Sequence, residues 1–249
     1  MRKVLRFLVA ASALFCVAGT ASAQVVTFDA LDSSYNSTYA PSYPFLGHDD
    51  FLVEGDYAIG LASTAAGALP GDLVGAVLDG SDPSSCFSVV CPGNNATNYL
   101  ALLNDGLPYF SRLDGTAFNL TQFDASFIAA SGVNVLDTAM LLRVFGVTEG
   151  GGIVLEDVWL PGPVSGNYNF STYALSATFA STAFVEVDFV GYACTTPELC
   201  TRSLNQAQFG LDNVSFANPV PEPGTWAMLC VGLVGVGVAA RRRRAAISA

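Results

Sequence analysis

Nucleophilic catalysis would need an imidazole to take the proton of a serine or cysteine, and this chain of 249 residues has one histidine, His48. His48 lies in the stretch GHDD (47–50), which matches no motif that partners a nucleophile, and the chain has no G-x-S-x-G element. The sequence therefore predicts no catalytic residue of this kind.

Carboxylate pairs are the other candidate for chemistry, because a glycosidase sets two acids at a fixed separation across a cleft. Two pairs fall in strand-like runs, which hold side chains in place: Glu156 with Asp157, and Glu186 with Asp188. A charged outer surface explains these acids equally well. We expect a protein that is not an enzyme and keep a secreted polysaccharide hydrolase as an alternative.

Metal ligands do not gather in the sequence. The oxygen-rich stretches 78–85 and 47–51 lack the spacing of an EF-hand, and neither recurs as a repeat. We predict no cofactor and no metal-binding residue, and leave a structural calcium ion open without assigned ligands.

The N-terminus (1–23) is typical of a secretory signal peptide. Arg2, Lys3 and Arg6 precede a short apolar run that ends in Ala21-Ser22-Ala23, a small-residue cleavage site. We predict cleavage after Ala23 and export of the remainder.

Cysteine spacing predicts disulfides in the exported part. Cys86 and Cys91 form one close pair and Cys194 and Cys200 another, with spacings unlike those of a zinc ribbon. Because export places them in an oxidising compartment, we favour the bonds Cys86–Cys91 and Cys194–Cys200 over the other connectivities.

The exported part is strongly acidic. Residues 24–219 contain 20 acidic residues and three basic ones, Arg112, Arg143 and Arg202, which gives a formal charge of −17. Such a surface repels nucleic acid, so we predict no nucleic-acid partner. It also disfavours anionic polysaccharide unless cations bridge the two.

Short β-strands fill the exported part. Runs rich in Val, Ile, Phe, Tyr and Thr are separated by Gly, Pro, Asn and Asp, and no stretch has a capped helical period. Val185, Val187 and Phe189 alternate with Glu186 and Asp188, which predicts one apolar and one acidic face. The expected strands are 25–31, 56–63, 73–79, 98–105, 116–120, 124–131, 139–148, 152–160, 168–175, 183–192 and 207–216.

This pattern predicts an all-β fold, with a single β-sandwich or jelly-roll domain over 24–219. The aromatic-rich stretch 32–55 is interpreted as a connection that covers one end of the core, with a binding loop as the alternative.

The C-terminus has three parts. Val220, Pro221, Glu222 and Pro223 come first, an uncharged run over 226–240 follows, and Arg241, Arg242, Arg243 and Arg244 come last. As a helix the run would be about 22 Å long, which is short for the roughly 30 Å of membrane hydrocarbon. We predict a short transmembrane helix that inserts transiently in the inner membrane, with the arginines as its cytoplasmic stop.

This order resembles the PEP-CTERM protein-sorting domain of Gram-negative bacteria, with residues 220–244 as the matching segment; the AAISA after the arginines is a small departure. The resemblance implies recognition at the Pro-Glu-Pro element by an exosortase, an integral-membrane transpeptidase similar to cysteine proteases, and removal of the tail. It also implies a protein of the cell surface or extracellular matrix, in bacteria that make exopolysaccharide and biofilm.

The body resembles PEP-CTERM proteins of the Q-F-x-x-D type. Gln208, Phe209 and Asp212 in QAQFGLDNVSF match the motif, and the strand-like pieces over 116–216 are similar to a galactose-binding-like jelly roll. The resemblance implies a carbohydrate-binding or adhesive module without catalytic residues. Alternation predicts that Phe209 and Leu211 share a face. For Asp212 we favour a structural role, as a cap of the turn or strand end, over contact with a ligand.

The sequence therefore favours an exported, exosortase-sorted surface or matrix protein without enzymatic activity, with extracellular polysaccharide as a candidate ligand. A structural matrix protein with no specific ligand stays open beside the hydrolase.

Overall fold

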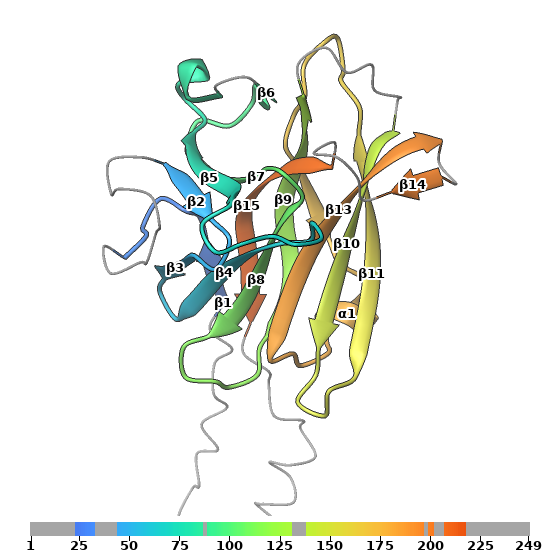
Figure 1. Cartoon of the computed structure of the whole chain (residues 1–249). Coiled ribbons are helices and arrows are strands. Elements are labelled where there is room, and N and C mark those ends of the chain that lie inside the picture. The colour runs from blue at the N-terminus through green and yellow to red at the C-terminus, as the bar shows by residue number, and fades with distance from the viewer. Residues whose placement is uncertain are drawn as a thin grey trace, which may run out of the picture. The chain divides into compact units, whose positions relative to one another are not determined.

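Two antiparallel sheets make up almost all of the body (Figure 1). The computed structural model describes residues 23–32, 44–86, 89–130, 138–196, 199–201 and 207–217. Within these ranges helix is limited to one turn of α-helix, α1 (Ala177–Ala180), and one of 3₁₀-helix, η1 (Pro83–Cys86). The expected all-β sandwich is confirmed.

Sheet A is the larger of the two. Its strand order is β12-β9-β15-β7-β5-β2, with β1 beside β15 and β6 beside β9. The strands of sheet A are β1 (Ala23–Val26), β2 (Phe45–Gly47), β5 (Leu73–Asp79), β6 (Val89–Val90), β7 (Asn98–Leu102), β9 (Asn119–Ala130), β12 (Ser171–Ala174) and β15 (Gln208–Ala217).

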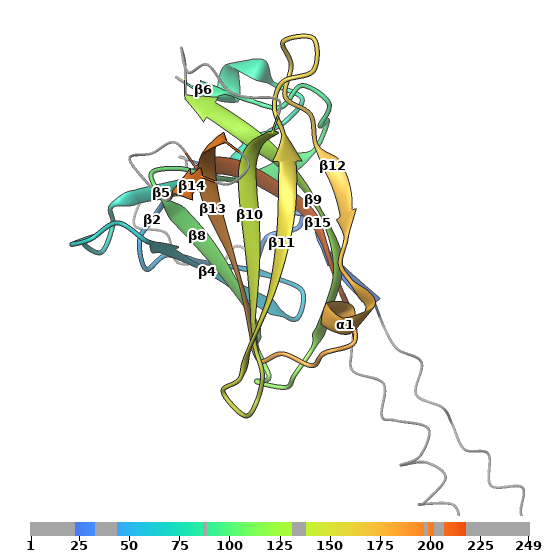
Figure 2. The ribbon, with the colours of Figure 1, turned by 90° about the vertical axis from the view of Figure 1, so that its right-hand side faces the viewer.

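Sheet B lies opposite, with the strand order β11-β10-β13-β8-β4-β3 and β14 beside β13. Figure 2 shows β4, β8, β13, β10 and β11 side by side. The strands of sheet B are β3 (Phe51–Glu54), β4 (Tyr57–Ser63), β8 (Gly106–Arg112), β10 (Thr138–Val147), β11 (Ile153–Pro161), β13 (Glu186–Thr196) and β14 (Leu199–Thr201).

The chain alternates between the sheets. It crosses from one to the other at β2/β3, β4/β5, β7/β8, β8/β9, β9/β10, β11/β12, β12/β13 and β14/β15. Repeated crossing of this kind is the connectivity of a jelly roll. The two ends of the body meet in sheet A, where Ala23 of β1 pairs with Ala217 of β15.

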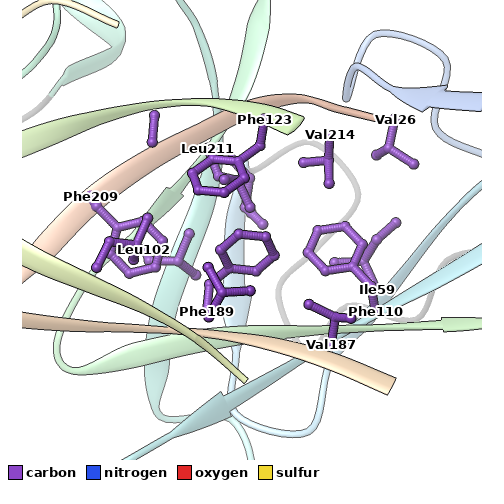
Figure 3. Packing of buried hydrophobic residues seen from close by; sticks show 14 of the residues in the cluster. Val26, Ile59, Leu102, Phe110, Phe123, Val187, Phe189, Phe209, Leu211 and Val214 are labelled. Carbon is purple, nitrogen blue, oxygen red and sulfur yellow. The ribbon is translucent and has the colours of Figure 1, made fainter. Parts of the chain in front are cut away.

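The core lies between the inner faces of the two sheets (Figure 3). Phe123 from sheet A meets Phe189 from sheet B edge to face, with ring centroids 5.0 Å apart. Phe209 and Leu211 share the inner face of β15 and are fully buried, as alternation predicted. Each such side chain contributes about 1.5–3 kcal/mol by leaving water.

The alternation predicted for β13 is confirmed at Val187 and Phe189, which are fully buried in this core. Val185 lies before the strand begins and is half-buried.

Several element predictions were wrong in extent. The predicted runs 116–120 and 124–131 overlap a single strand, β9, which spans 119–130, and β8 was missed because Pro108 interrupts its apolar run. The stretch 32–55 contains β2 and β3, so it is more than a connection.

The run 168–175 was also wrong in extent. It is a strand only from Ser171. Tyr168 packs on Phe127 in the central core, whereas Phe170 packs on Tyr99 outside sheet A.

Both disulfides are present. Cys86–Cys91 closes the segment between β5 and β7, and Cys194–Cys200 joins β13 to β14. The pairing favoured from the cysteine spacing is confirmed.

Candidate functional site

The two sheets differ in how their outer faces are covered. On sheet A, the segment between β5 and β7 and the residues before β12 lie over a small apolar cluster. The cluster contains Ala76, Leu78, Tyr99, Ala101 and Ile128, with Phe45, Val89, Cys91 and Phe170 packed against it. On sheet B, large apolar side chains are open to solvent: Ile153 is 65% exposed, Leu155 51%, Trp159 42% and Phe51 39%.

Strand register arranges the outer side chains of sheet B in rows. Residues paired across antiparallel strands point to the same face of the sheet. One row crosses six strands and the other crosses three. The first row is Leu155, Phe145, Asp188, Tyr109, Gly60 and Phe51, and the second is Trp159, Leu141 and Tyr192. We call Phe51, Tyr109, Phe145, Trp159 and Tyr192 the aromatic face.

An ion pair separates the two rows. Arg143 on β10 donates from Nε and Nη2 to the two carboxylate oxygens of Asp157 on β11, at 2.6 and 2.7 Å. Its guanidinium also lies 5.5 Å from the ring centroid of Tyr192. The guanidinium holds the pKa of Asp157 below its usual range, so both charges are already paired within the face.

Asp188 stands between two aromatic residues in the longer row. It pairs in register with Phe145 on one side and Tyr109 on the other. Its Oδ1 atom is buried and has no hydrogen-bond partner within the described residues. Burial, and to a lesser extent the negative charge of Glu186, raise the pKa of Asp188 to about 7. The half-buried carboxylate therefore lacks the compensation that buried charge normally has.

Tyr109 depends on a glycine for its position. A Cβ atom at Gly60 would lie 2.0 Å from Cζ of Tyr109 and 2.3 Å from its hydroxyl oxygen. The ring therefore occupies the space that a side chain on β4 would take. Partial burial, followed by the charges of Asp49, Glu186 and Asp188, raises the pKa of Tyr109.

Asp212 belongs to a different region, the outer face of sheet A, where it is part of β15. The carboxylate is buried and accepts hydrogen bonds from Asn95 Nδ2 at 2.8 Å and from the backbone N–H of Asn213 at 2.7 Å. Asp124, its partner across the sheet, accepts from Asn213 Nδ2 at 2.8 Å and from Thr172 Oγ1 at 2.5 Å. These bonds fasten the segment before β7 to the sheet, which is a structural role.

A polar cavity of about 370 Å³ lies beside this network. Burial is the main reason that the pKa of Asp212 rises to about 6. The remaining motif residues are placed differently: Gln208 is buried at the start of β15, and Phe209 belongs to the central core.

The carboxylates proposed from sequence do not form a facing pair. Glu156 accepts hydrogen bonds from the N–H and hydroxyl of Ser176 at the start of α1, at 2.6 and 2.5 Å. Asp157, the next residue, is held by Arg143. Glu186 and Asp188 lie two residues apart on one strand and one face, an arrangement without the opposed wall of a glycosidase cleft.

His48 lies in the turn after β2. Its Nδ1 accepts a hydrogen bond from the backbone N–H of Ser63 at 3.1 Å, and its Nε2 lies 3.6 Å from Asp49 Oδ1. The first contact ties the turn to the end of β4.

The oxygen-rich stretches use their carboxylates locally. Asp79 accepts from Ser81, Asp82 from the N–H of Ser84, and Asp50 from the N–H of Gly47. Among the described residues, no three His, Cys, Asp or Glu side chains gather in a way that could hold a metal ion. A structural calcium ion stays a prediction without assigned ligands.

The terminal predictions fall mainly outside the described residues. Ala23, the expected cleavage position, is the first residue of β1. The rest of the signal peptide, Val220, Pro221, Glu222, Pro223, the run 226–240 and Arg241, Arg242, Arg243 and Arg244 lie outside the described ranges. No helix within those ranges is long and apolar enough to cross a membrane.

Sequence reasoning missed the aromatic face. It found Glu186 and Asp188 on an outer surface but did not single out the aromatic residues beside them. The signal was present in β11, where apolar residues occupy both the inward and the outward positions. Val158 and Leu160 point inward, and Leu155 and Trp159 point outward. A strand with one simply solvated face would carry polar residues at the outward positions.

The PEP-CTERM protein-sorting motif matches residues 219–244. The match starts one residue before the segment predicted from sequence and confirms that resemblance. The motif implies an exported, surface-sorted protein that an exosortase processes. The assignment of Gln208, Phe209 and Asp212 to the Q-F-x-x-D type stays a prediction.

Likenesses to solved structures are distant. A DUF4465 family protein from Bacteroides caccae ATCC 43185 has a TM-score of 0.44 and 14% identity, over 78% of this chain and 98% of that one. The enzymatically active domain of bacteriophage CBA120 tailspike protein 4 has a TM-score of 0.30 and 13% identity, over 65% of this chain and 19% of that one. TmCBM61 in complex with β-1,4-galactotriose has a TM-score of 0.30 and 6% identity, over 64% of this chain and 86% of that one. No curated protein matches the chain.

At TM-scores this low, the likenesses support no conclusion about ligand or activity. The candidate site therefore depends on the geometry of sheet B alone.

Proposed function

We propose that the protein is a non-enzymatic component of the cell surface or extracellular matrix that binds polysaccharide through the aromatic face. The aromatic side chains on the outer face of sheet B carry this proposal: Phe51 and Trp159 are 39% and 42% exposed, and Tyr109, Phe145 and Tyr192 are half-buried. Contiguous exposed apolar surface on a soluble domain commonly marks a site of interaction. Tyrosine and tryptophan suit a wet interface because each combines an apolar ring with a polar group.

Sugar rings match this surface chemically. The C–H groups on one side of a pyranose ring form an apolar patch that stacks on an aromatic ring, while the hydroxyls around its edge form hydrogen bonds. The aromatic face offers rings for stacking, and Arg143, Asp157, Glu186 and Asp188 offer polar groups between them. A few placed polar groups among apolar ones are the usual composition of a ligand site.

Binding without hydrolysis accords with the placement of the acids. Glu156 and Asp157 are engaged by Ser176 and Arg143, and Glu186 and Asp188 share one side of a sheet. Hydrolysis of a glycosidic bond requires acids on both sides of that bond.

Co-sedimentation with exopolysaccharide from the producing cells tests the proposal. We expect the exported protein to be retained, and the double variant Tyr109→Ala/Trp159→Ala to lose at least tenfold in affinity because both rows lose a ring. Leu113→Ala is the matched control, since Leu113 is 58% exposed in the turn after β8. No retention of the parent protein on any polysaccharide offered would favour a matrix protein without a specific ligand. Release of new reducing ends during incubation would favour the hydrolase.

A further inference from the structure

The longer row of sheet B has a regular spacing. Phe145, Tyr109 and Phe51 lie on alternate strands, so two inter-strand steps separate each from the next. Two steps are about 9.6 Å, roughly the length of a disaccharide unit in an extended glycan. Glycine at position 60 leaves room for the Tyr109 ring between β8 and β3. A chain laid across the strands would therefore meet an aromatic ring once in every two sugars.

The charge along this row is negative. Asp188 lies within the row, and Glu186 lies two residues before it on the same outer face of β13. The positive charge of Arg143 is already paired with Asp157. The row thus holds one carboxylate, that of Asp188, between the rings of Phe145 and Tyr109, and Glu186 adds a second negative charge beside it, on a body whose formal charge is −17.

A cation fits this arrangement better than a neutral or anionic group. An ammonium would supply the partner that Asp188 lacks within the described residues, because a charge-assisted hydrogen bond offsets the cost of holding a carboxylate out of water. The rings beside it also attract a cation over their faces. Burial, and to a lesser extent the charge of Glu186, raise the pKa of Asp188, and a cation beside the carboxylate would favour its charged form.

We propose that the outer face of sheet B takes an extended, cationic amino-sugar polysaccharide laid across the strands along the row from Phe145 to Phe51, with Glu186 and Asp188 accepting hydrogen bonds from its ammonium groups. This inference rests on the proposed function, because it names the class of glycan that the aromatic face binds.

Three β-1,4-linked hexasaccharides distinguish the effect of charge on affinity from that of the sugar backbone. They are the hexamer of glucosamine, the hexamer of N-acetylglucosamine, and cellohexaose. Calorimetric titration of the exported protein at neutral pH and low salt gives each affinity. We expect the glucosamine hexamer to bind at least tenfold more tightly than either neutral hexamer. We also expect the glucosamine trimer to bind at least fivefold more weakly than its hexamer, because the trimer reaches fewer rings.

A charge-neutralising pair of variants locates the effect. Glu186→Gln/Asp188→Asn should lower affinity for the glucosamine hexamer at least fivefold and leave any cellohexaose binding unchanged. Asp79→Asn/Asp82→Asn removes two negative charges at the exposed end of β5 and in the turn after it and should change neither affinity. Thermal unfolding of the parent and the two double variants checks that each is folded.

The outcomes separate the two proposals. Equal binding of charged and neutral hexamers, or an equal loss with the Asp79/Asp82 variant, overturns the amino-sugar assignment and leaves the proposed function standing. Equal binding of trimer and hexamer overturns the extended path across the strands. If no hexamer and no exopolysaccharide binds, the proposed function fails as well.

Discussion

Asp188 is held in the folded protein at a cost in stability. Burial raises its pKa to about 7, against about 3.9 in an unfolded chain. Between these values the folded state binds more protons than the unfolded state, so stability falls as pH rises from about 4 to 7 and is level above that. An acid retained under such a penalty, on a surface with no described partner for it, is a candidate for function.

The variant Asp188→Asn tests this cost directly. Because the amide does not titrate, we expect it to be more stable than the parent by roughly 1–2 kcal/mol at pH 8, after discounting for partial exposure, and equal to it at pH 4. Urea unfolding at the two pH values measures the difference. The pKa of Asp212 is also raised by burial, so Asp212 makes the free energy of unfolding depend on pH in both the parent and the variant. A variant less stable than the parent at pH 8 would show that the carboxylate has a stabilising partner.

At the scale of the element, β4 and β8 together set the position of Tyr109. In Gly60→Ala the new methyl group would occupy the place of the ring, so the ring must rotate away from the row. We expect glycan affinity to fall about fivefold with a stability change below about 1 kcal/mol, since alanine suits a strand better than glycine does. The control is Gly93→Ala, which meets no atom within 4 Å.

A double-mutant cycle completes that test by measuring calorimetric affinities. If Gly60→Ala acts through the ring, it should have no further effect in a Tyr109→Ala background. A similar loss in both backgrounds would mean that the glycine itself contacts the glycan or that β4 is distorted.

The strands differ in how well their sequences predict them. The bounds of β5 were predicted residue for residue, and the two faces of β13 followed from alternation at Val187, Asp188 and Phe189. Both depend on local pattern. The strand β8 was missed, because Pro108 weakens a strand prediction. The row itself could not be predicted, because it requires the register of six strands, most of them distant in sequence.

At the scale of the whole molecule, the ends of the body and the aromatic face belong to different sheets. Ala23 and Ala217 pair in sheet A, and the sorting motif begins two residues after Ala217, at 219. Removing the tail would therefore leave every strand of sheet B intact. The acidic body would attract a polycation over a distance that salt shortens. We therefore attribute the long-range attraction of the glycan to net charge and its specific binding to the aromatic face.

The claim that sheet B is the glycan-binding surface is tested most directly by hydroxyl-radical footprinting of the exported protein, with and without saturating exopolysaccharide. Aromatic side chains react readily and are identified by mass spectrometry. We expect protection of Phe51, Tyr109, Phe145, Trp159 and Tyr192, and unchanged oxidation of Leu113 and Val164, which are 58% and 63% exposed and lie outside the strands of sheet B. Unchanged oxidation of the aromatic face in a saturated complex, with protection at the cavity beside Asp212 or elsewhere, would contradict the account.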